Sequence, residues 1–354
     1  MTARIRGTRA LDLADNDALL VTAREDVRWI SGFTGSHGWL LVDRESIVLL
    51  TDGRYMDQAR AEVGGEVRVR ICRTTGEMVG AVRDTFMNGF AAQDEALDVA
   101  TWKRITRSIG RVPEAAAPGL TDLRRTKDEG EASVIARAAD IASVALGDCL
   151  ELVAPGVTER RLRDALEARM RELGADGPSY DTIVATGPSN SARPHHHPTD
   201  RPIIIGDSVV IDVGALVDGY HSDMTRTFFV GDPDPELLAW YDALSVAQQA
   251  AIDTVAPGRA VSEVDEAARR VLRERGVERW FTHGLGHGVG LLIHENPFIR
   301  STSDAVLRPG DVVTIEPGLY RDGLGGIRIE DLLLVTETAA VNLTKAPKDP
   351  TCPR

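Results

Sequence analysis

Between residues 18 and 50, short apolar runs alternate with turn residues. Apolar runs of this length, bounded by Gly, Ser and Asp, predict the strands of a sheet. The runs are LLVT, VRWISGF, WLLV and IVLLTDG. Residues 53–63 and 76–88 have the pattern of helices. This part of the chain therefore predicts a small α/β domain.

The segment TDLRRTKDEGE, residues 121–131, is charged and polar and has no apolar periodicity. Such a segment is typical of a connection between domains. We therefore expect an N-terminal domain of residues 1–122 and a larger domain of residues 123–354.

Beyond this boundary, apolar residues recur every three to four positions, which predicts a helix over residues 132–153. A second amphipathic helix follows, with Thr158 as its N-cap and Gly174 at its end. Two further helices are predicted at residues 236–255 and 261–275. Short strands account for the remainder. Helices segregated from antiparallel strands are typical of an α+β fold.

The 354-residue chain has a formal net charge of −13, which opposes general nucleic-acid binding because that needs a basic face. Its three cysteines, Cys72, Cys149 and Cys352, are far apart, and this suits a reducing compartment. The N-terminus lacks the apolar segment of a secretory signal, and no apolar run approaches the length of a membrane span. We therefore expect a cytoplasmic protein that binds neither nucleic acid nor membrane.

The larger predicted domain contains an internal repeat. GDSVVIDVG at 206–214 aligns without gaps on GDVVTIEPG at 310–318, and Asp212 falls on Glu316. Each copy leads through an Asp-Gly turn into a further strand that has its own carboxylate, Asp223 in the first copy and Glu330 in the second. The repeated unit is therefore strand, acid, hairpin, acid, strand.

A hairpin brings the two acids of each copy together. Directly opposed residues of antiparallel strands have Cβ atoms about 4.5–5.5 Å apart. Glu316 and Glu330 are symmetric about Gly323 and should oppose each other; Asp212 and Asp223 should do so with allowance for a bulge. Like charges at this separation raise one pKa strongly or require a cation. A lone acid would favour a salt bridge, but four acids in paired register predict a site for more than one cation.

Histidines between the two copies extend the set of ligands. THGLGHGVGLLIHEN contains His283, His287 and His294, and its glycines oppose a helix. One imidazole among four carboxylates suits Mn²⁺, Co²⁺, Zn²⁺ or Fe²⁺. Two such ions about 3.5–4 Å apart can activate water and polarise a carbonyl. The pattern thus predicts metal-assisted hydrolysis.

The order Asp212, Asp223, His287, Glu316, Glu330 resembles the ligand signature of the pita-bread metallopeptidases. The neighbouring words DxGxxxxGYxSDxTRTF, HGxGHGVGLxxHE, IEPG and GGIRIED carry the same resemblance over residues 127–340. It implies a pseudo-twofold antiparallel sheet with flanking helices. It also implies that Asp212 is bidentate on one ion, that Asp223 and Glu330 bridge, and that His287 and Glu316 complete the other shell. Glu316 would also handle the proton of the nucleophile.

VRWISGFTGSHGWLLV and LLTDGRYMDQA are similar to the N-terminal domain of the branch with creatinase, prolidase and Xaa-Pro aminopeptidase. Creatinase does not keep the ligands, and all five are present here. We therefore expect an Xaa-Pro aminopeptidase that acts on short proline-containing peptides. The alternatives are a strict Xaa-Pro dipeptidase, or prolidase, and a non-catalytic binding protein of the same fold. The preference for the aminopeptidase rests on finding no extra basic residue near the motifs for a dipeptide's carboxylate. Two Mn²⁺ ions, with Co²⁺ or Zn²⁺ as alternatives, and a homodimer or higher homo-oligomer are expected.

The resemblance also implies roles for residues around the metal ligands. His195, His283 and His294 would contact substrate, and His294 would hydrogen-bond the substrate carbonyl. The catalytic residues would be His195, His294, Glu316 and Arg328. Arg328, two residues before Glu330, would orient the acids from the same face of the strand.

We interpret His196 and His197, beside His195, as surface residues. In the N-terminal domain, Asp52, Arg54 and Tyr55 either contribute to a subunit interface or a neighbouring site, or form a plain turn.

Overall fold

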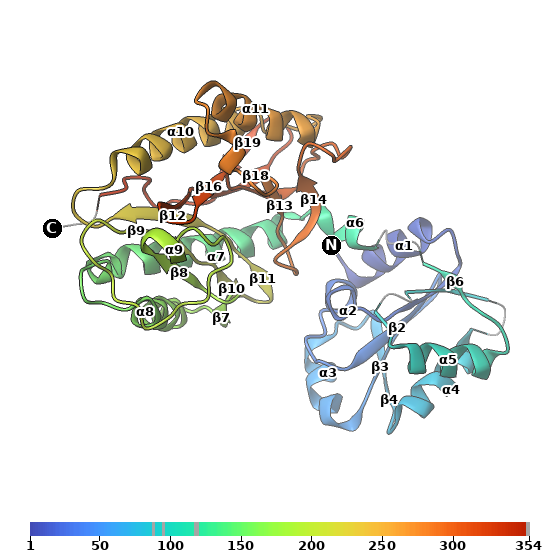
Figure 1. Cartoon of the computed structure of the whole chain (residues 1–354). Helices are drawn as coiled ribbons and strands as arrows, with labels where there is room; N and C mark the ends of the chain where they lie inside the picture. Colours follow the sequence, from blue (N-terminus) through green and yellow to red (C-terminus); the bar gives the residue numbers. More distant parts are fainter. Residues whose placement is uncertain (87–88, 94–95, 117–119, 352–354) are drawn as a thin grey trace. The chain divides into compact units, whose positions relative to one another are not determined.

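The computed structural model describes residues 1–86, 89–93, 96–116 and 120–351. The chain divides into two compact units, Met1–Arg124 and Arg125–Arg354 (Figure 1). Both units mix helices and sheets, and the α+β fold with a smaller α/β N-terminal domain is confirmed. Among the described residues, no helix is long and apolar enough to cross a membrane.

The N-terminal unit is built on a six-stranded mixed sheet in the order β4-β3-β2-β1-β5-β6. Its strands are β1 Ala18–Val21, β2 Gly38–Asp43, β3 Ile47–Thr51, β4 Val67–Ile71, β5 Ala91–Ala92 and β6 Glu114–Ala115. Its helices are α1 Ala3–Leu13, α2 Arg24–Ser31, α3 Met56–Glu62, α4 Thr75–Thr85 and α5 Val99–Ile109, and α6 Leu120–Arg125 leads into the second unit. The helix expected at residues 76–88 is α4; residues 87–88 lie outside the described part of the chain.

The prediction that VRWISGF forms a strand is wrong. This stretch belongs to α2, whose first turn is acidic and whose chain turns at Gly32 in the left-handed conformation (φ 80°). Val27 and Ile30 are both buried and lie three positions apart, which is the spacing of residues on one face of a helix. In so short a run, helical and strand periodicity are hard to separate, and the Gly helix stop is the signal that decides.

The second unit places two similar halves side by side. The first has α7 Glu129–Asp148, α8 Glu159–Glu172, β7 Gly177–Pro178, β8 Ile183–Thr186, α9 Gly187–Asn190, β9 Ser208–Asp212, β10 Ala215–Val217, β11 Tyr220–His221 and β12 Thr225–Phe229. The second has α10 Pro235–Ile252, α11 Val261–Glu274, β13 Gly286–Gly288, β14 Glu295–Ile299, β15 Val312–Ile315, β16 Gly318–Arg321, β17 Gly325–Arg328, β18 Asp331–Val335 and β19 Ala340–Asn342.

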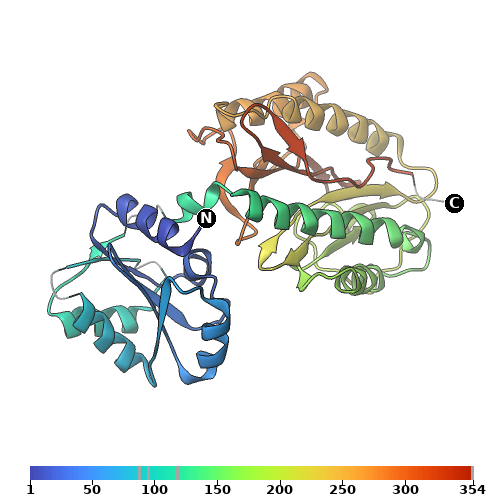
Figure 2. The same ribbon diagram turned by 180° about the vertical axis from the view of Figure 1, so that it is seen from behind.

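Antiparallel sheets in each half carry the acids. β12-β9-β8 forms one sheet, β14-β13-β15-β18-β19 forms the other, and the hairpins β10-β11 and β16-β17 extend from them. One apolar cluster packs α7 and α8 on the first sheet, and another packs α10 and α11 on the second. Helix α7 also contacts the second half through Ile135 and Ala139, and it runs lengthwise along this unit (Figure 2).

The internal repeat is also a repeat of local structure. Gly206 and Gly310 both have the left-handed conformation, at φ 93° and 89°. The Asp that follows each Gly accepts a hydrogen bond from the backbone N–H three residues earlier in its turn: Asp207 from Ile204 at 2.9 Å and Asp311 from Arg308 at 2.8 Å. The two turns therefore lead into β9 and β15 with the same local structure, and an acid lies at the end of each strand.

The predicted opposition of acids holds in one hairpin and is wrong in the other. Ile315 pairs with Asp331 and Gly318 with Arg328 in one register, so Glu316 lies opposite Glu330. Asp212 instead pairs with Thr225. Asp223 therefore lies two residues short of the directly opposed position and faces Asp212 diagonally. Gly214 permits this close approach, because a Cβ there would lie 1.9 Å from the Ser222 carbonyl oxygen.

Candidate active site

A cavity of about 670 Å³ opens over the ends of these strands in the second unit. Every residue predicted to bind metal or substrate lines it: His195, Asp212, Asp223, His283, His287, His294, Glu316, Arg328 and Glu330. The volume is in the range of small-ligand sites. Segments more than 100 residues apart in sequence thus converge on one concave surface.

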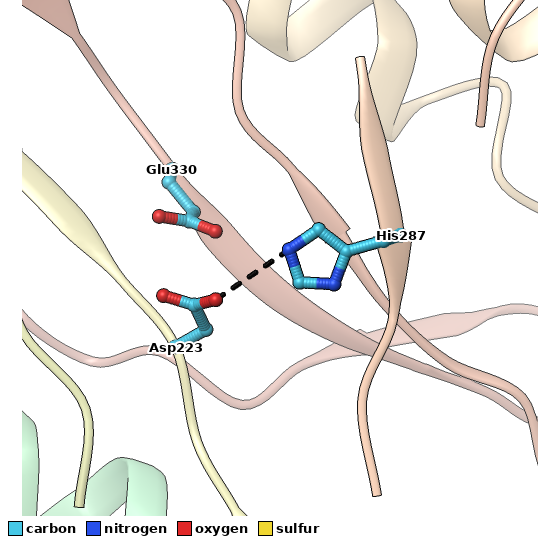
Figure 3. A group of neighbouring side chains, drawn as sticks. All are labelled: Asp223, His287 and Glu330. Carbon is cyan, nitrogen blue, oxygen red and sulfur yellow. Dashed lines mark ion pairs between the residues drawn. The ribbon is translucent and has the colours of Figure 1, made fainter. Parts of the chain in front are cut away.

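Three of the predicted ligands form a tight cluster. Asp223 precedes β12, His287 lies in β13 and Glu330 precedes β18; their ligand atoms lie within 4.8 Å of one another. Their side chains point toward a common centre (Figure 3). His287 Nε2 lies 3.6 Å from Asp223 Oδ2 and 3.4 Å from Glu316 Oε1. This arrangement suits a cation held between a nitrogen and several oxygens.

The electrostatics of the cluster favour cations. Burial, and then Asp212 and Glu316, raise the pKa of Asp223 well above its ordinary value. Burial, and then Asp223 and Glu316, do the same to the pKa of Glu330, and burial raises the pKa of Glu316 to about 8. Glu330 Oε1 is buried and has no hydrogen-bond partner among the described residues. Divalent ions fit here because they offset the repulsion and occupy that acceptor.

His287 has the protonation state that a metal ligand needs. Burial, and then His294, lower its pKa to about 4, so the ring is neutral at pH 7. Its Nδ1 contacts the Gly288 carbonyl oxygen at 3.0 Å, which assigns the proton to Nδ1. The lone pair of Nε2 is therefore directed at the acids.

Asp212 is held at the edge of the cluster by Arg328. The guanidinium Nη2 donates to Asp212 Oδ2 at 2.6 Å, and Nε donates to Thr225 Oγ1 at 2.9 Å. Thr225 Oγ1 in turn donates to Glu330 Oε2 at 2.7 Å. Arg328 thus contacts one predicted ligand directly and another through Thr225, and its orienting role stays a prediction.

Sequence reasoning missed Tyr180. Its hydroxyl contacts Asp212 Oδ1 and Asp223 Oδ1, and burial, followed by these two acids, raises its pKa well above the ordinary value. It was also silent on Tyr320, whose hydroxyl accepts from Arg328 at 2.9 Å. Neither tyrosine lies in a spacing pattern with the acids, so no local signal could have found them.

The three histidines predicted to contact substrate lie at different depths. His283 is partly buried; its Nε2 contacts Tyr320 Oη at 3.1 Å, and burial, and then Arg328, lower its pKa to about 4. The His294 ring stacks edge-on against His287 at 4.3 Å, and burial lowers its pKa too. His195 is exposed and lines the cavity. All three line the cavity, and contact with a substrate stays a prediction.

The expectation that His196 is a surface residue is wrong. It is 5% exposed, and its Nε2 lies 2.9 Å from Glu159 Oε2. A histidine run gives no hint of such burial, because the partner carboxylate lies 37 residues away. His197 is exposed, as expected.

In the N-terminal unit, Asp52 caps a short 3₁₀ turn at Gly53–Tyr55 and forms an ion pair with Arg54 at 2.8 Å. Tyr55 Oη lies 2.6 Å from Ser36 Oγ. These contacts account for the local turn, and a role at an interface stays a prediction.

The comparisons with known proteins now decide the family. Residues 133–337 match metallopeptidase family M24, and residues 6–122 match the creatinase/prolidase N-terminal domain. The chain belongs to metallopeptidase family M24. The expectation of a metallo-exopeptidase is thereby confirmed, and divalent metal ions are implied.

Relatives of the peptidase span nearly its whole length. It is 34% identical over 342 residues to an Xaa-Pro dipeptidase of Pyrococcus horikoshii, covering 96% of this chain and 95% of that one. The structure of an Xaa-Pro dipeptidase from Bacillus anthracis superposes with a TM-score of 0.91 at 34% identity, over 98% of each chain. An X-Pro aminopeptidase from Thermotoga maritima gives a TM-score of 0.89 at 34% identity, over 96% of this chain and 99% of the other.

Proposed function

We propose that the peptidase hydrolyses Xaa-Pro dipeptides with two divalent metal ions, and that these ions are Mn²⁺, which this set of ligands suits. The proposal is supported by the cluster of four acids and one imidazole in a single cavity and by the dipeptidases among its relatives. A proline nitrogen carries no N–H, so a site that works on the carbonyl side has an advantage over one that recognises that N–H.

The residues of the cavity divide the work of hydrolysis. Asp212, Asp223, His287, Glu316 and Glu330 would hold the ions. When bound, the ions supply Lewis acidity toward water and toward the scissile carbonyl. In this scheme, the Glu316 carboxylate takes a proton from the attacking water and delivers it to the leaving proline nitrogen.

Imidazoles and a guanidinium surround this centre. His294 and His195 would donate hydrogen bonds to the oxygen on which negative charge develops, as donors of an oxyanion site do. In this scheme, His283 contacts the proline ring of the substrate. Arg328 keeps Asp212 in place, because its guanidinium holds that carboxylate at 2.6 Å.

Arg300 changes the preference between dipeptidase and aminopeptidase. It follows β14, lines the cavity and is exposed, with its guanidinium 5.7 Å from the Phe298 ring centre. A guanidinium in this position suits a dipeptide's carboxylate, which is a strong bidentate partner. The preference for an aminopeptidase rested on finding no basic residue near the sequence motifs that could bind this carboxylate.

Substrates with and without a terminal carboxylate test this proposal. We expect Ala-Pro to be cleaved faster than Ala-Pro-amide, and Arg300→Ala to raise KM for Ala-Pro about 10–100-fold, as expected for a hydrogen bond to a charged group. Arg300→Lys should recover part of the loss, and Ala-Pro-amide should be insensitive to either change.

An aminopeptidase is the second candidate, favoured by the similarity to the Thermotoga maritima X-Pro aminopeptidase. Equal turnover of Ala-Pro-Ala and Ala-Pro, with no effect of Arg300→Ala on either, would establish it in place of the dipeptidase. A cytoplasmic location is a further proposal, supported by the scattered cysteines, of which Cys72 and Cys149 are free and buried. A homodimer or higher homo-oligomer stays a prediction.

A further inference from the structure

A buried carboxylate at the start of α8 binds two segments of the first half together. Glu159 is 0% exposed. Its Oε1 accepts hydrogen bonds from the backbone N–H and the hydroxyl of Thr186, both at 2.8 Å, and from Asn190 Nδ2 at 3.0 Å. These donors lie at the end of β8 and in α9. One oxygen of Glu159 thus accepts three hydrogen bonds from β8 and α9.

The other oxygen of Glu159 binds the loop of residues 191–200. Oε2 lies 2.9 Å from His196 Nε2 and accepts from the backbone N–H of Thr199 at 2.9 Å and its hydroxyl at 2.7 Å. Burial raises the pKa of Glu159, but hydrogen bonds from Asn190, Thr199 and His196 hold it below its ordinary value. The carboxylate can only accept, so His196 Nε2 carries the proton and donates.

His195 lies between two anchored neighbours. On one side, the Pro194 carbonyl oxygen accepts from Arg328 Nη1 at 3.3 Å. On the other side, His196 is fixed by Glu159. His195 itself is exposed and lines the cavity. The direction of its imidazole therefore depends on both anchors, and one of them is remote from the predicted metal ligands in sequence.

We propose that Glu159 is a positioning residue for Xaa-Pro hydrolysis, which acts through His196 and Thr199 to hold His195 against the substrate. This inference rests on the proposed function, because it assumes that His195 contacts the peptide. It assigns the second histidine of the HHH run to loop anchoring and the first to substrate.

A double-mutant cycle tests the coupling between Glu159 and His195. Positioning contacts of this kind are worth about 10–100-fold in activity, so Glu159→Gln should lower kcat/KM for Ala-Pro by about that factor. In the His195→Ala background, Glu159→Gln should have little further effect, because the group that it positions is gone. Losses that multiply in the double variant would overturn the inference.

Further variants separate positioning from stability. Asp26→Asn is a matched control, since Asp26 is 1% exposed and ion-paired with Arg124 at 2.6 Å in the N-terminal unit; it should lower stability and leave kcat/KM unchanged. Should Glu159→Gln fail to fold, His196→Gln and His196→Ala replace it. The amide of Gln keeps a donor, so His196→Gln should retain more activity than His196→Ala; equal losses in both would count against the inference.

Amide hydrogen exchange tests the anchoring without turnover. In Glu159→Gln, the backbone amides of residues 195–197 and of Thr199 should exchange faster than in the wild type, and in Asp26→Asn they should not. Unchanged exchange in Glu159→Gln would overturn the inference even if Ala-Pro is a substrate. If Ala-Pro is not hydrolysed, the proposed function fails, and with it the role assigned to Glu159 in hydrolysis. If Ala-Pro is hydrolysed but His195→Ala is fully active, the proposed function stands and the inference about Glu159 fails.

Discussion

Thr225→Val tests how the hydrogen bonds that hold the acids support metal binding. Thr225 is fully buried, and its hydroxyl donates to Glu330 Oε2 at 2.7 Å while accepting from Arg328 at 2.9 Å. Val has nearly the same shape and no hydroxyl. Loss of a hydrogen bond to a metal ligand lowers metal affinity about 10–100-fold, or about 1.4–2.8 kcal/mol at 1.4 kcal/mol per tenfold.

Thr227→Val is the matched control. Thr227 lies two residues further along β12 and is equally buried, but its hydroxyl contacts the backbone of Arg328, at 2.9 Å to the carbonyl oxygen and 3.1 Å to the nitrogen. We expect this change to lower the free energy of unfolding by about 1–3 kcal/mol and to leave metal affinity intact. Calorimetric titration with Mn²⁺ and urea unfolding measure the two effects. Equal Mn²⁺ affinity in wild type and Thr225→Val would refute the reasoning.

Three further predictions concern activity, stability and pH. Glu316→Ala should lower kcat for Ala-Pro by about 10²–10⁴-fold, since it removes a proton carrier; near wild-type turnover would exclude that role. Gly206→Ala and Gly310→Ala both force a left-handed residue, at about 1–2 kcal/mol, but only at Gly310 would the Cβ lie 2.8 Å from the Lys127 carbonyl oxygen. Urea unfolding should therefore show the larger loss for Gly310→Ala. The folded pKa of Glu159 is below its ordinary value of 4.5, so its contribution to stability is present above pH 4.5 and is lost as pH falls. The difference in the free energy of unfolding between wild type and Glu159→Gln should therefore shrink below pH 4.5. A difference that is constant with pH would contradict a lowered pKa of Glu159 in the folded state.

The metal-ligand pattern could be predicted because it is local and repeated. Strand periodicity, the Asp-Gly turns and the duplicated GD…G frame place an acid at the end of β9 and of β15. The second hairpin kept the symmetric register. In the first, the partner of Asp212 is Thr225, and the offset of Asp223 depends on a tight approach at Gly214 that no periodicity reports.

Residues with distant partners could not be predicted in this way. Tyr180 is 32 residues from Asp212, and His196 is 37 residues from Glu159. Arg300 was hidden for a similar reason, because only the fold places the residue after β14 in the cavity wall. In each case the chemistry is set by tertiary contact, and the sequence around the residue has the composition of an ordinary loop.

Anomalous diffraction at the manganese edge, from crystals grown with Mn²⁺, tests the central claim most directly. The account predicts two Mn²⁺ peaks in the cavity, within coordination distance of Asp212, Asp223, His287, Glu316 and Glu330. The absence of peaks among these side chains, with Mn²⁺ bound elsewhere or not at all, would contradict it.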